Sequence, residues 1–178
     1  MQNISSNEQE QQNVGNKKIL QKEFIKFICL YIFLPALLTY FLFGYVFTIA
    51  MVSGISMYPT LKERQIVVSF NLFYTPQRGD VIICQPQTYD KRLIKRVIAV
   101  ENDTVFIDKE SGDVYINGKK LDEPYIKKEA LNTVPDSPIT ILPNHIFVMG
   151  DNRNNSLDSR SEIIGQVPIN DIIGKVII

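Results

Sequence analysis

The stretch Ser53–Thr60, SGISMYPT, separates two parts of the chain that differ in character. A long apolar run ends before it, and the first charged residue after that run, Lys62, comes only beyond it. Gly54 permits a close backbone approach and Pro59 fixes a turn, so the stretch is shaped to present the side chain of Ser56. Ser56 is therefore a candidate nucleophile. The alternative is a Ser/Gly/Pro linker between an anchor and a domain.

The apolar run, residues 27–52, contains 26 residues without a charge and is rich in Phe, Leu, Ile and Tyr. A helix needs roughly 20 apolar residues to cross a bilayer. The run is far longer than the ~7–15 residues of a signal-peptide core, and Pro35 is tolerated within a membrane helix. We therefore predict an uncleaved transmembrane helix over Phe27–Val52.

The tail before this helix, residues 1–26, is rich in Gln, Asn, Ser and Glu and becomes basic towards its end. No lysine or arginine follows the helix before Lys62, whereas four lysines precede it: Lys17, Lys18, Lys22 and Lys26. By the positive-inside rule, the tail is expected in the cytoplasm and residues 53–178 outside it. The sequence thus predicts a single-pass membrane protein with an extracytoplasmic domain.

Charge and residue counts exclude several functions. Lysine plus arginine equal aspartate plus glutamate at 19 each, so no basic excess points to nucleic acid. His145 is the only histidine of the chain, so a zinc site built on several histidines is excluded. We expect no metal or cofactor. Cys29 lies in the apolar run and Cys84 in the domain, so we expect two separate buried thiols rather than a disulfide.

Beyond the anchor, short alternating runs separated by turn residues predict a mainly β domain over residues 53–178. The pair Asn117-Gly118 predicts a two-residue hairpin turn, because both residues accept positive φ at low cost. Residues 127–138 contain two prolines and are expected to form the longest surface loop. The expected strands are Ile66–Phe70, Val81–Gln85, Leu93–Val100, Thr104–Asp108, Asp113–Ile116, Ile139–Leu142, His145–Met149 and Lys175–Ile178.

The predicted strand Leu93–Val100 holds two adjacent cations, Lys95 and Arg96, among apolar residues. Neighbouring strand residues point to opposite faces, so these two side chains lie on opposite faces of the sheet. If Lys95 shares the face of Leu93 and Val97, burial favours its neutral amine, which can act as a base. The alternative is a basic edge strand that prevents pairing with other chains.

A polar run, Gly150–Arg160, follows the predicted strand His145–Met149. Such a run is usually a solvated loop. Here it contains acidic partners for arginines and several side chains that can bond to backbone groups. It is therefore also a candidate support that folds against a functional site.

Together these residues resemble the type I signal peptidases, which are membrane-bound serine proteases with a Ser-Lys dyad. The resemblance extends from the anchor to Val176 and implies a compact all-β catalytic domain without the inserted second domain of larger members. Four motifs in one order behind an anchor are far more specific than any one of them. They are SMYPT at Ser56–Thr60, RGDVI at Arg78–Ile82, KRVIA at Lys95–Ala99, and the run Gly150–Arg160.

The resemblance implies a role for individual residues in these motifs. It implies Ser56 as the nucleophile, Lys95 as the general base, and Ser156 as the residue that orients the lysine. Charged residues of the third and fourth motifs are implied as supports of the site: Arg96, Asp151, Arg153, Asp158 and Arg160.

The reaction that the resemblance implies is removal of signal peptides from exported preproteins, after Ala-x-Ala-like sites, at the outer face of the bacterial cytoplasmic membrane. The implied partners are preproteins, the lipid bilayer and the export machinery. One alternative is a self-cleaving Ser-Lys protein related to the SOS-response repressors, but those need a DNA-binding half where this chain has a helix. Another is a catalytically silent anchored β domain that binds exported proteins.

The chain departs from the family pattern at three places. Some members carry a serine two residues before the nucleophile, and its hydroxyl helps to form the oxyanion hole. This chain has Gly54 there, which leaves the Ser56 N–H as the main expected donor. The Gly-Asp that often follows the lysine motif is replaced by Asn102-Asp103, and residues 160–165 lack the customary aromatic residue.

Overall fold

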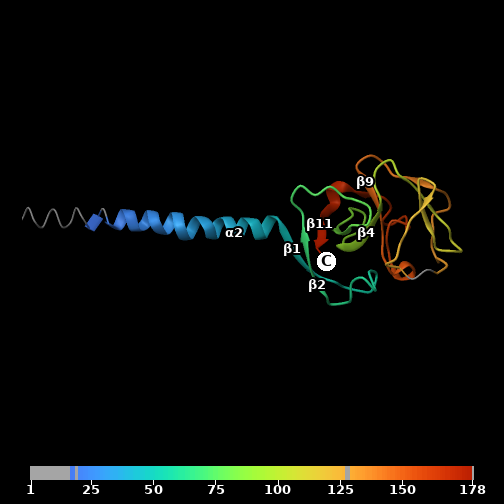
Figure 1. Cartoon of the computed structure of the whole chain (residues 1–178), viewed down its shortest axis with the longest axis horizontal. Helices are drawn as coiled ribbons and strands as arrows, with labels where there is room; N and C mark the ends of the chain where they lie inside the picture. Colours follow the sequence, from blue (N-terminus) through green and yellow to red (C-terminus); the bar gives the residue numbers. More distant parts are fainter. Residues whose placement is uncertain (1–16, 19, 127–128, 178) are drawn as a thin grey trace, which may run out of the picture. The chain divides into compact units, whose positions relative to one another are not determined.

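The structure is a computed structural model that describes residues 17, 18, 20–126 and 129–177. The chain divides into two compact units, residues 1–44 and residues 45–178. Each unit is described by itself below (Figure 1).

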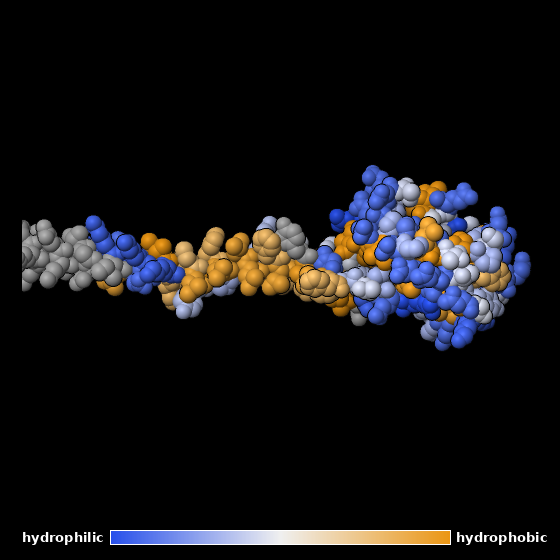
Figure 2. Space-filling view, turned by 90° about the horizontal axis from the view of Figure 1, so that it is seen from above, coloured by the Kyte–Doolittle hydropathy of each residue, from blue (hydrophilic) through white to orange (hydrophobic). Residues whose placement is uncertain are grey.

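The N-terminal unit contains the expected apolar helix. Residues 20–44 are helical, long and apolar enough to cross a membrane, and Figure 2 shows a hydrophobic surface along most of this helix. A π-helical turn, η1 (Cys29–Phe33), precedes α2 (Leu34–Tyr45), and the Leu34 N–H donates to the carbonyl of Cys29. Pro35 explains this turn, because proline has no N–H and its ring clashes with the carbonyl four residues earlier.

The helix starts earlier than the hydropathy alone predicts. Residues 20–28 are already helical, so the helix begins inside the predicted tail. The remainder of that tail lies mostly outside the described residues, which omit residues 1–16 and 19.

The predicted end of the helix at Val52 is wrong. Helix α2 ends at Tyr45, and Phe47–Met51 form strand β1, which pairs antiparallel with Ile66–Phe70. This part of the apolar run is short and rich in β-branched and aromatic residues, so it fits a strand as well as a helix. Backbone hydrogen bonds with Ile66–Phe70 favour the strand over the helix. A hydropathy profile contains no information on such pairing.

The domain is built on a seven-stranded antiparallel sheet in the order β1-β2-β11-β3-β4-β9-β10 (Figure 1). Its strands are β1 (Phe47–Met51), β2 (Ile66–Phe70), β3 (Val81–Cys84), β4 (Leu93–Ala99), β9 (His145–Met149), β10 (Val167–Pro168) and β11 (Ile172–Ile177). Two short 3-10 helices, η2 (Arg153–Asn155) and η3 (Ile169–Asp171), lie in its connections.

A second, four-stranded sheet has the order β7-β6-β5-β8. Its strands are β5 (Thr104–Ile107), β6 (Val114–Ile116), β7 (Lys119–Lys120) and β8 (Ile139–Thr140). The Asn117-Gly118 turn is confirmed: it joins β6 to β7, with φ of 53° and 78° at its two residues. Only the 3-10 turns and connecting loops supplement the strands in the described part of this domain, which confirms that it is mainly β.

Every predicted strand overlaps an observed one, and β2 and β9 agree at both ends. The sequence missed β1 and the two-residue strands β7 and β10. Strand β11 begins three residues before its predicted start at Lys175, and Ile178 lies outside the described residues. In the predicted loop 127–138, residues 127 and 128 are not described, and Leu131 is buried in the core.

Strand β4 passes through the middle of the core. Ile94 packs with one buried cluster, Val97 with a second, and Ile98 with a third that also contains residues of the small sheet. Apolar contacts on both faces thus hold β4 in place. Any polar side chain on this strand must either pair inside the protein or lose its charge.

Candidate active site

Ser56 and Lys95, 39 residues apart in sequence, meet in the structure. The Lys95 Nζ lies 2.7 Å from the Ser56 Oγ. Lys95 comes from the middle of β4 and is 3% exposed, whereas Ser56 is half-buried on the loop after β1. A neutral amine at this distance from a serine hydroxyl can accept its proton and so activate the oxygen as a nucleophile.

The loop that carries Ser56 is anchored on both sides of it. Val52 before it and Met57 and Leu61 after it are buried in one apolar cluster. The backbone turns between these anchors, with the Tyr58 N–H donating to the carbonyl of Ile55 at 3.1 Å. The serine is therefore held at the surface of the core with its side chain turned towards β4.

The electrostatic environment of Lys95 favours its neutral form. Burial lowers the pKa of the amine below its usual 10.5, and the nearby Arg160 acts in the same direction. The carboxylate of Asp158 opposes this shift but does not cancel it. Burial also raises the pKa of the neighbouring Cys84 thiol to about 12, so the thiol is uncharged at neutral pH. The prediction of a desolvated lysine is thus supported by its surroundings.

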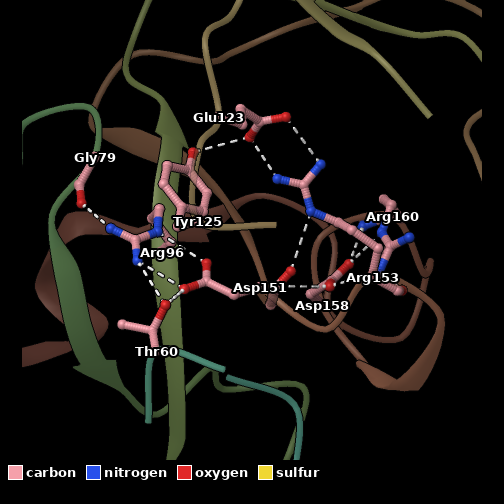
Figure 3. Close-up of polar contacts among 10 residues, drawn as sticks. Thr60, Gly79, Arg96, Glu123, Tyr125, Asp151, Arg153, Asp158 and Arg160 are labelled. Atoms are coloured by element: carbon pink, nitrogen blue, oxygen red, sulfur yellow. Dashed lines mark hydrogen bonds and ion pairs between the residues drawn. The ribbon is translucent and has the colours of Figure 1, made fainter. Parts of the chain in front are cut away.

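Arg96, the next residue along β4, makes a separate set of contacts. Its Nε and one terminal nitrogen donate to the two carboxylate oxygens of Asp151 at 2.8 and 2.7 Å. Its other terminal nitrogen donates to the carbonyl of Gly79 at 2.7 Å. Thr60, on the loop that carries Ser56, donates to the same Asp151 carboxylate. The ion pair thus connects β4, the loop that carries Ser56 and the polar run that starts at Gly150 (Figure 3).

That polar run folds against the loop that carries Ser56 rather than into solvent. The Asn152 N–H donates to the carbonyl of Ser56 at 3.0 Å, and its side-chain amide donates to the carbonyl of Ile55 at 3.2 Å. Gly150 leaves no room for a side chain, because a Cβ there would lie 2.5 Å from the Ser56 carbonyl oxygen and 2.3 Å from the Ser156 Oγ. The run therefore packs directly on the backbone of Ser56.

Two further arginines of the run are buried in ion pairs. Arg160 donates to both oxygens of Asp158, at 2.8 and 2.9 Å, and Arg153 pairs with Glu123. Asp158 also accepts from the Gly150 N–H at 2.9 Å. Burial disfavours the charge of Asp158, but these hydrogen bonds hold its pKa below the usual range. All the charged residues predicted as supports are thus paired inside the protein.

Comparison with known proteins places the chain in a family. Residues 22–178 match the family model described as signal peptidase, peptidase S26. The chain belongs to the signal peptidase family, peptidase S26. It is 37% identical to signal peptidase I S of Bacillus subtilis, over 84% of this chain and 83% of that protein. It is 35% identical to a signal peptidase I of Bacillus amyloliquefaciens, over 93% of this chain and 91% of that protein.

Among solved structures, the chain resembles a crystal structure of a signal peptidase I from Enterococcus faecalis. The sequence identity is 29% and the TM-score is 0.46, with 57% of this chain and 97% of that chain covered.

Ser156, the residue that the signal peptidase resemblance assigns to orienting the lysine, lies against Gly150. Within the described residues, its buried Oγ makes no hydrogen bond of good geometry, although the hydroxyl lies near enough to Asp158 to help lower the pKa of that carboxyl. The orientation of Lys95 by Ser156 therefore stays a prediction for this member of the signal peptidase family.

Two of the departures from the signal peptidase pattern are accommodated by the backbone. Gly54 has φ of 87°, a conformation that favours glycine, although a Cβ there would meet nothing within 4 Å. Asn102, which replaces a glycine, has φ of 67° and so adopts the left-handed conformation itself. The next residue, Asp103, accepts hydrogen bonds from Arg78 at 2.9 Å and from Asn117 at 2.9 Å. These contacts join the turn before β3 to the β4–β5 connection and the β6–β7 turn.

Sequence reasoning missed two residues next to the site, Glu123 and Tyr125. They lie in a polar segment between β7 and β8 with no periodic pattern, and nothing in the local sequence marks them. Within the described residues, no group of three or more His, Cys, Asp or Glu side chains is arranged to hold a metal.

Replacing Asp151 by asparagine tests whether the Arg96–Asp151 pair holds the site together. The neutral amide would leave the buried guanidinium without its counter-charge, and breaking a buried pair in this way costs about 3–5 kcal/mol. We expect D151N to unfold at a clearly lower temperature in detergent, measured by circular dichroism. The exposed Asp122 offers a matched control, since D122N should leave the midpoint unchanged. Equal midpoints for both variants would contradict the structural role of the pair.

Proposed function

We propose that this chain is a signal peptidase I that removes signal peptides from exported preproteins after Ala-x-Ala-like sites. We propose Ser56 as its nucleophile and Lys95 as its general base. The observation that supports these roles is the 2.7 Å contact between the Lys95 Nζ and the Ser56 Oγ, made by a lysine whose burial lowers its pKa and so favours the neutral amine.

The proposed reaction begins when the lone pair of neutral Lys95 accepts the proton of the Ser56 hydroxyl. The Ser56 oxygen attacks the scissile carbonyl, and the ammonium of Lys95 then gives its proton to the leaving amine. Water, deprotonated by the same lysine, hydrolyses the acyl-enzyme and frees Ser56. The ammonium of Lys95 then gives this proton to the Ser56 oxygen as it leaves the acyl group, so one amine carries two proton transfers in each half of the reaction.

The backbone N–H of Ser56 is the proposed donor to the oxyanion. In the described part of the chain, this N–H has no acceptor of its own, so it is free to bind a developing negative charge. The Asn152 contact fixes the opposite side of the same residue by binding the Ser56 carbonyl. The orientation of the Ser56 N–H is thereby restricted before substrate binds.

An extended substrate has a strand edge available beside the dyad. Strand β9 pairs with β4 from Arg96 onwards, whereas β3 pairs with Leu93–Arg96 on the other side. Among the described residues, Leu93–Lys95 thus lack a strand partner on the β9 side, next to the base. A peptide added along this edge would gain main-chain hydrogen bonds and pass Ser56.

We further propose that the protein is anchored in the bacterial cytoplasmic membrane by its apolar helix, with its N-terminus inside and the β domain outside. Lysines near the start of the helix support this orientation, because they are retained on the cytoplasmic side. The domain would then meet preproteins as they leave the export machinery.

The Ser56→Ala variant tests the nucleophile. It should lose at least about 10³-fold in cleavage rate of an Ala-x-Ala preprotein, because the Lys95 amine would have no serine oxygen to activate. The thermal unfolding midpoint should stay near that of the wild type, because the hydroxyl serves chemistry rather than packing. Gel analysis of the purified full-length protein with the preprotein measures the loss. Undiminished cleavage would remove the serine-protease assignment, and an inactive wild type would favour a silent binding domain.

The Lys95→Arg variant separates a base from a mere positive charge. Guanidinium keeps the charge but cannot be deprotonated, so the rate should fall by about 10²–10⁴-fold. In the wild type the cleavage rate should rise with pH as Lys95 loses its proton. This rise should occur below pH 10.5, the usual pKa of lysine, because burial lowers the pKa of Lys95. The free energy of unfolding should also rise between the lowered pKa and the usual one, since the lysine of the unfolded chain binds its proton more tightly. A variant with wild-type activity would show that Lys95 only balances charge.

Accessibility to added protease tests the proposed orientation. In spheroplasts, protease should degrade the β domain, while an epitope placed before residue 17 should survive until the membrane is permeabilised. Immunoblotting of both regions gives the measurement. Protection of the domain together with loss of the epitope would reverse the orientation.

A further inference from the structure

The segment Glu123–Tyr125 covers the ion pair beside the dyad, although it belongs to the long connection between β7 and β8. The Arg96 Cζ lies 3.9 Å from the centroid of the Tyr125 ring, so the guanidinium is packed on the ring face. The same guanidinium binds Asp151 through its edge. Figure 3 shows Tyr125 and Asp151 on different sides of the Arg96 head group. Tyr125 therefore restricts the access of water to the pair.

Glu123 connects this ring to the polar run. Its carboxylate accepts a hydrogen bond from the Tyr125 hydroxyl at 2.9 Å and pairs with both terminal nitrogens of Arg153. Arg153 in turn donates to the carbonyl of Gly150 at 3.2 Å. Glu123 is 4% exposed and Arg153 is 2% exposed, so each buried charge needs the other as its counter-charge. Asp151 is thus flanked by the covered Arg96 on one side and by the Glu123–Arg153 pair on the other.

These contacts are linked to Ser56 through the two residues next to Asp151 in the chain. Asp151 lies between Gly150, which packs against the Ser56 carbonyl, and Asn152, which donates to that carbonyl. Because Gly150 has no room for even a Cβ, a small shift of this backbone must move Ser56 as well. Displacement of a reacting group by about 1 Å can cost about 10²-fold in rate.

We propose that Glu123 and Tyr125 are positioning residues for peptide-bond cleavage, a proposal that rests on the function proposed above. Tyr125 fixes the Arg96 guanidinium between its ring and Asp151. Glu123 fixes Tyr125 and Arg153 at once and so fixes the backbone of Gly150–Asn152. Their effect on catalysis passes through Asp151 and Asn152 to Ser56.

The two interactions of Tyr125 can be separated by substitution. Tyr125→Phe keeps the ring over Arg96 and loses only the hydroxyl contact with Glu123, whereas Tyr125→Leu removes the ring. In purified full-length protein acting on an Ala-x-Ala preprotein, we expect Tyr125→Leu to lower kcat by about 10- to 100-fold with KM within about twofold of wild type. Tyr125→Phe should retain kcat within about threefold, since a ring face suffices to hold the cation.

Tyr115→Leu is the matched control, because it removes a tyrosine that packs on Phe106 in the small sheet. Its kcat should equal that of the wild type even if its unfolding temperature falls. Glu123→Gln provides a second test, since it keeps the shape of the side chain and removes the charge that faces Arg153. It should also lower kcat with little change in KM, measured at a temperature where circular dichroism shows the variant folded.

The outcomes distinguish the two proposals. If folded Tyr125→Leu and Glu123→Gln keep the wild-type kcat and lose only thermal stability, the segment is a structural cover and the positioning role is wrong. Equal loss of kcat in Tyr125→Phe and Tyr125→Leu would also overturn the role given to the ring. A wild-type protein that leaves the preprotein uncut would overturn the proposed function, and the positioning role with it. A cleaving wild type with the expected split between Phe and Leu supports both.

Discussion

The burial of one amine on a central strand is the constraint around which the domain is organised. An ammonium in the core is costly unless it is paired or neutralised, and Lys95 faces a hydroxyl rather than a carboxylate partner. The surroundings are arranged to keep carboxylates near but not bonded to it. Asp158 is bound by Arg160, and Asp151 is bound by Arg96. Each of these two carboxylates is paired with an arginine. Neither forms an ion pair with Lys95, which would have stabilised the charged form of the lysine.

This arrangement explains why so many charges lie inside a small β domain. Buried ion pairs contribute little to stability by themselves, since desolvation offsets much of their attraction. Here the two charges of each pair compensate one another close to Lys95, whose pKa is lowered by burial. They also join segments that are distant in sequence, because Arg96 contacts the loop that carries Ser56, the turn at Gly79 and the polar run. Fold stability and site electrostatics therefore depend on the same side chains.

Sequence reasoning identified the residues whose neighbours carry a pattern. Ser56 stands between a glycine and a proline, and Lys95 interrupts an apolar strand, so both positions are conspicuous. Most strands were found because alternation survives even in short segments. Glu123 and Tyr125 were missed because their partners, Arg153 and Arg96, lie far from them in sequence. Long-range contacts of this kind leave no local periodicity, so only the folded chain reveals them.

The change from helix to strand inside the apolar run has a practical consequence for anyone who wishes to study the domain without its anchor. Hydropathy places the boundary at Val52, but a soluble fragment that began at Ser53 would lack β1 entirely. The sheet would then end at β2, whose exposed edge could pair with another molecule and drive aggregation. A fragment must begin no later than Val46, which is itself buried, and so must retain several apolar residues that look dispensable.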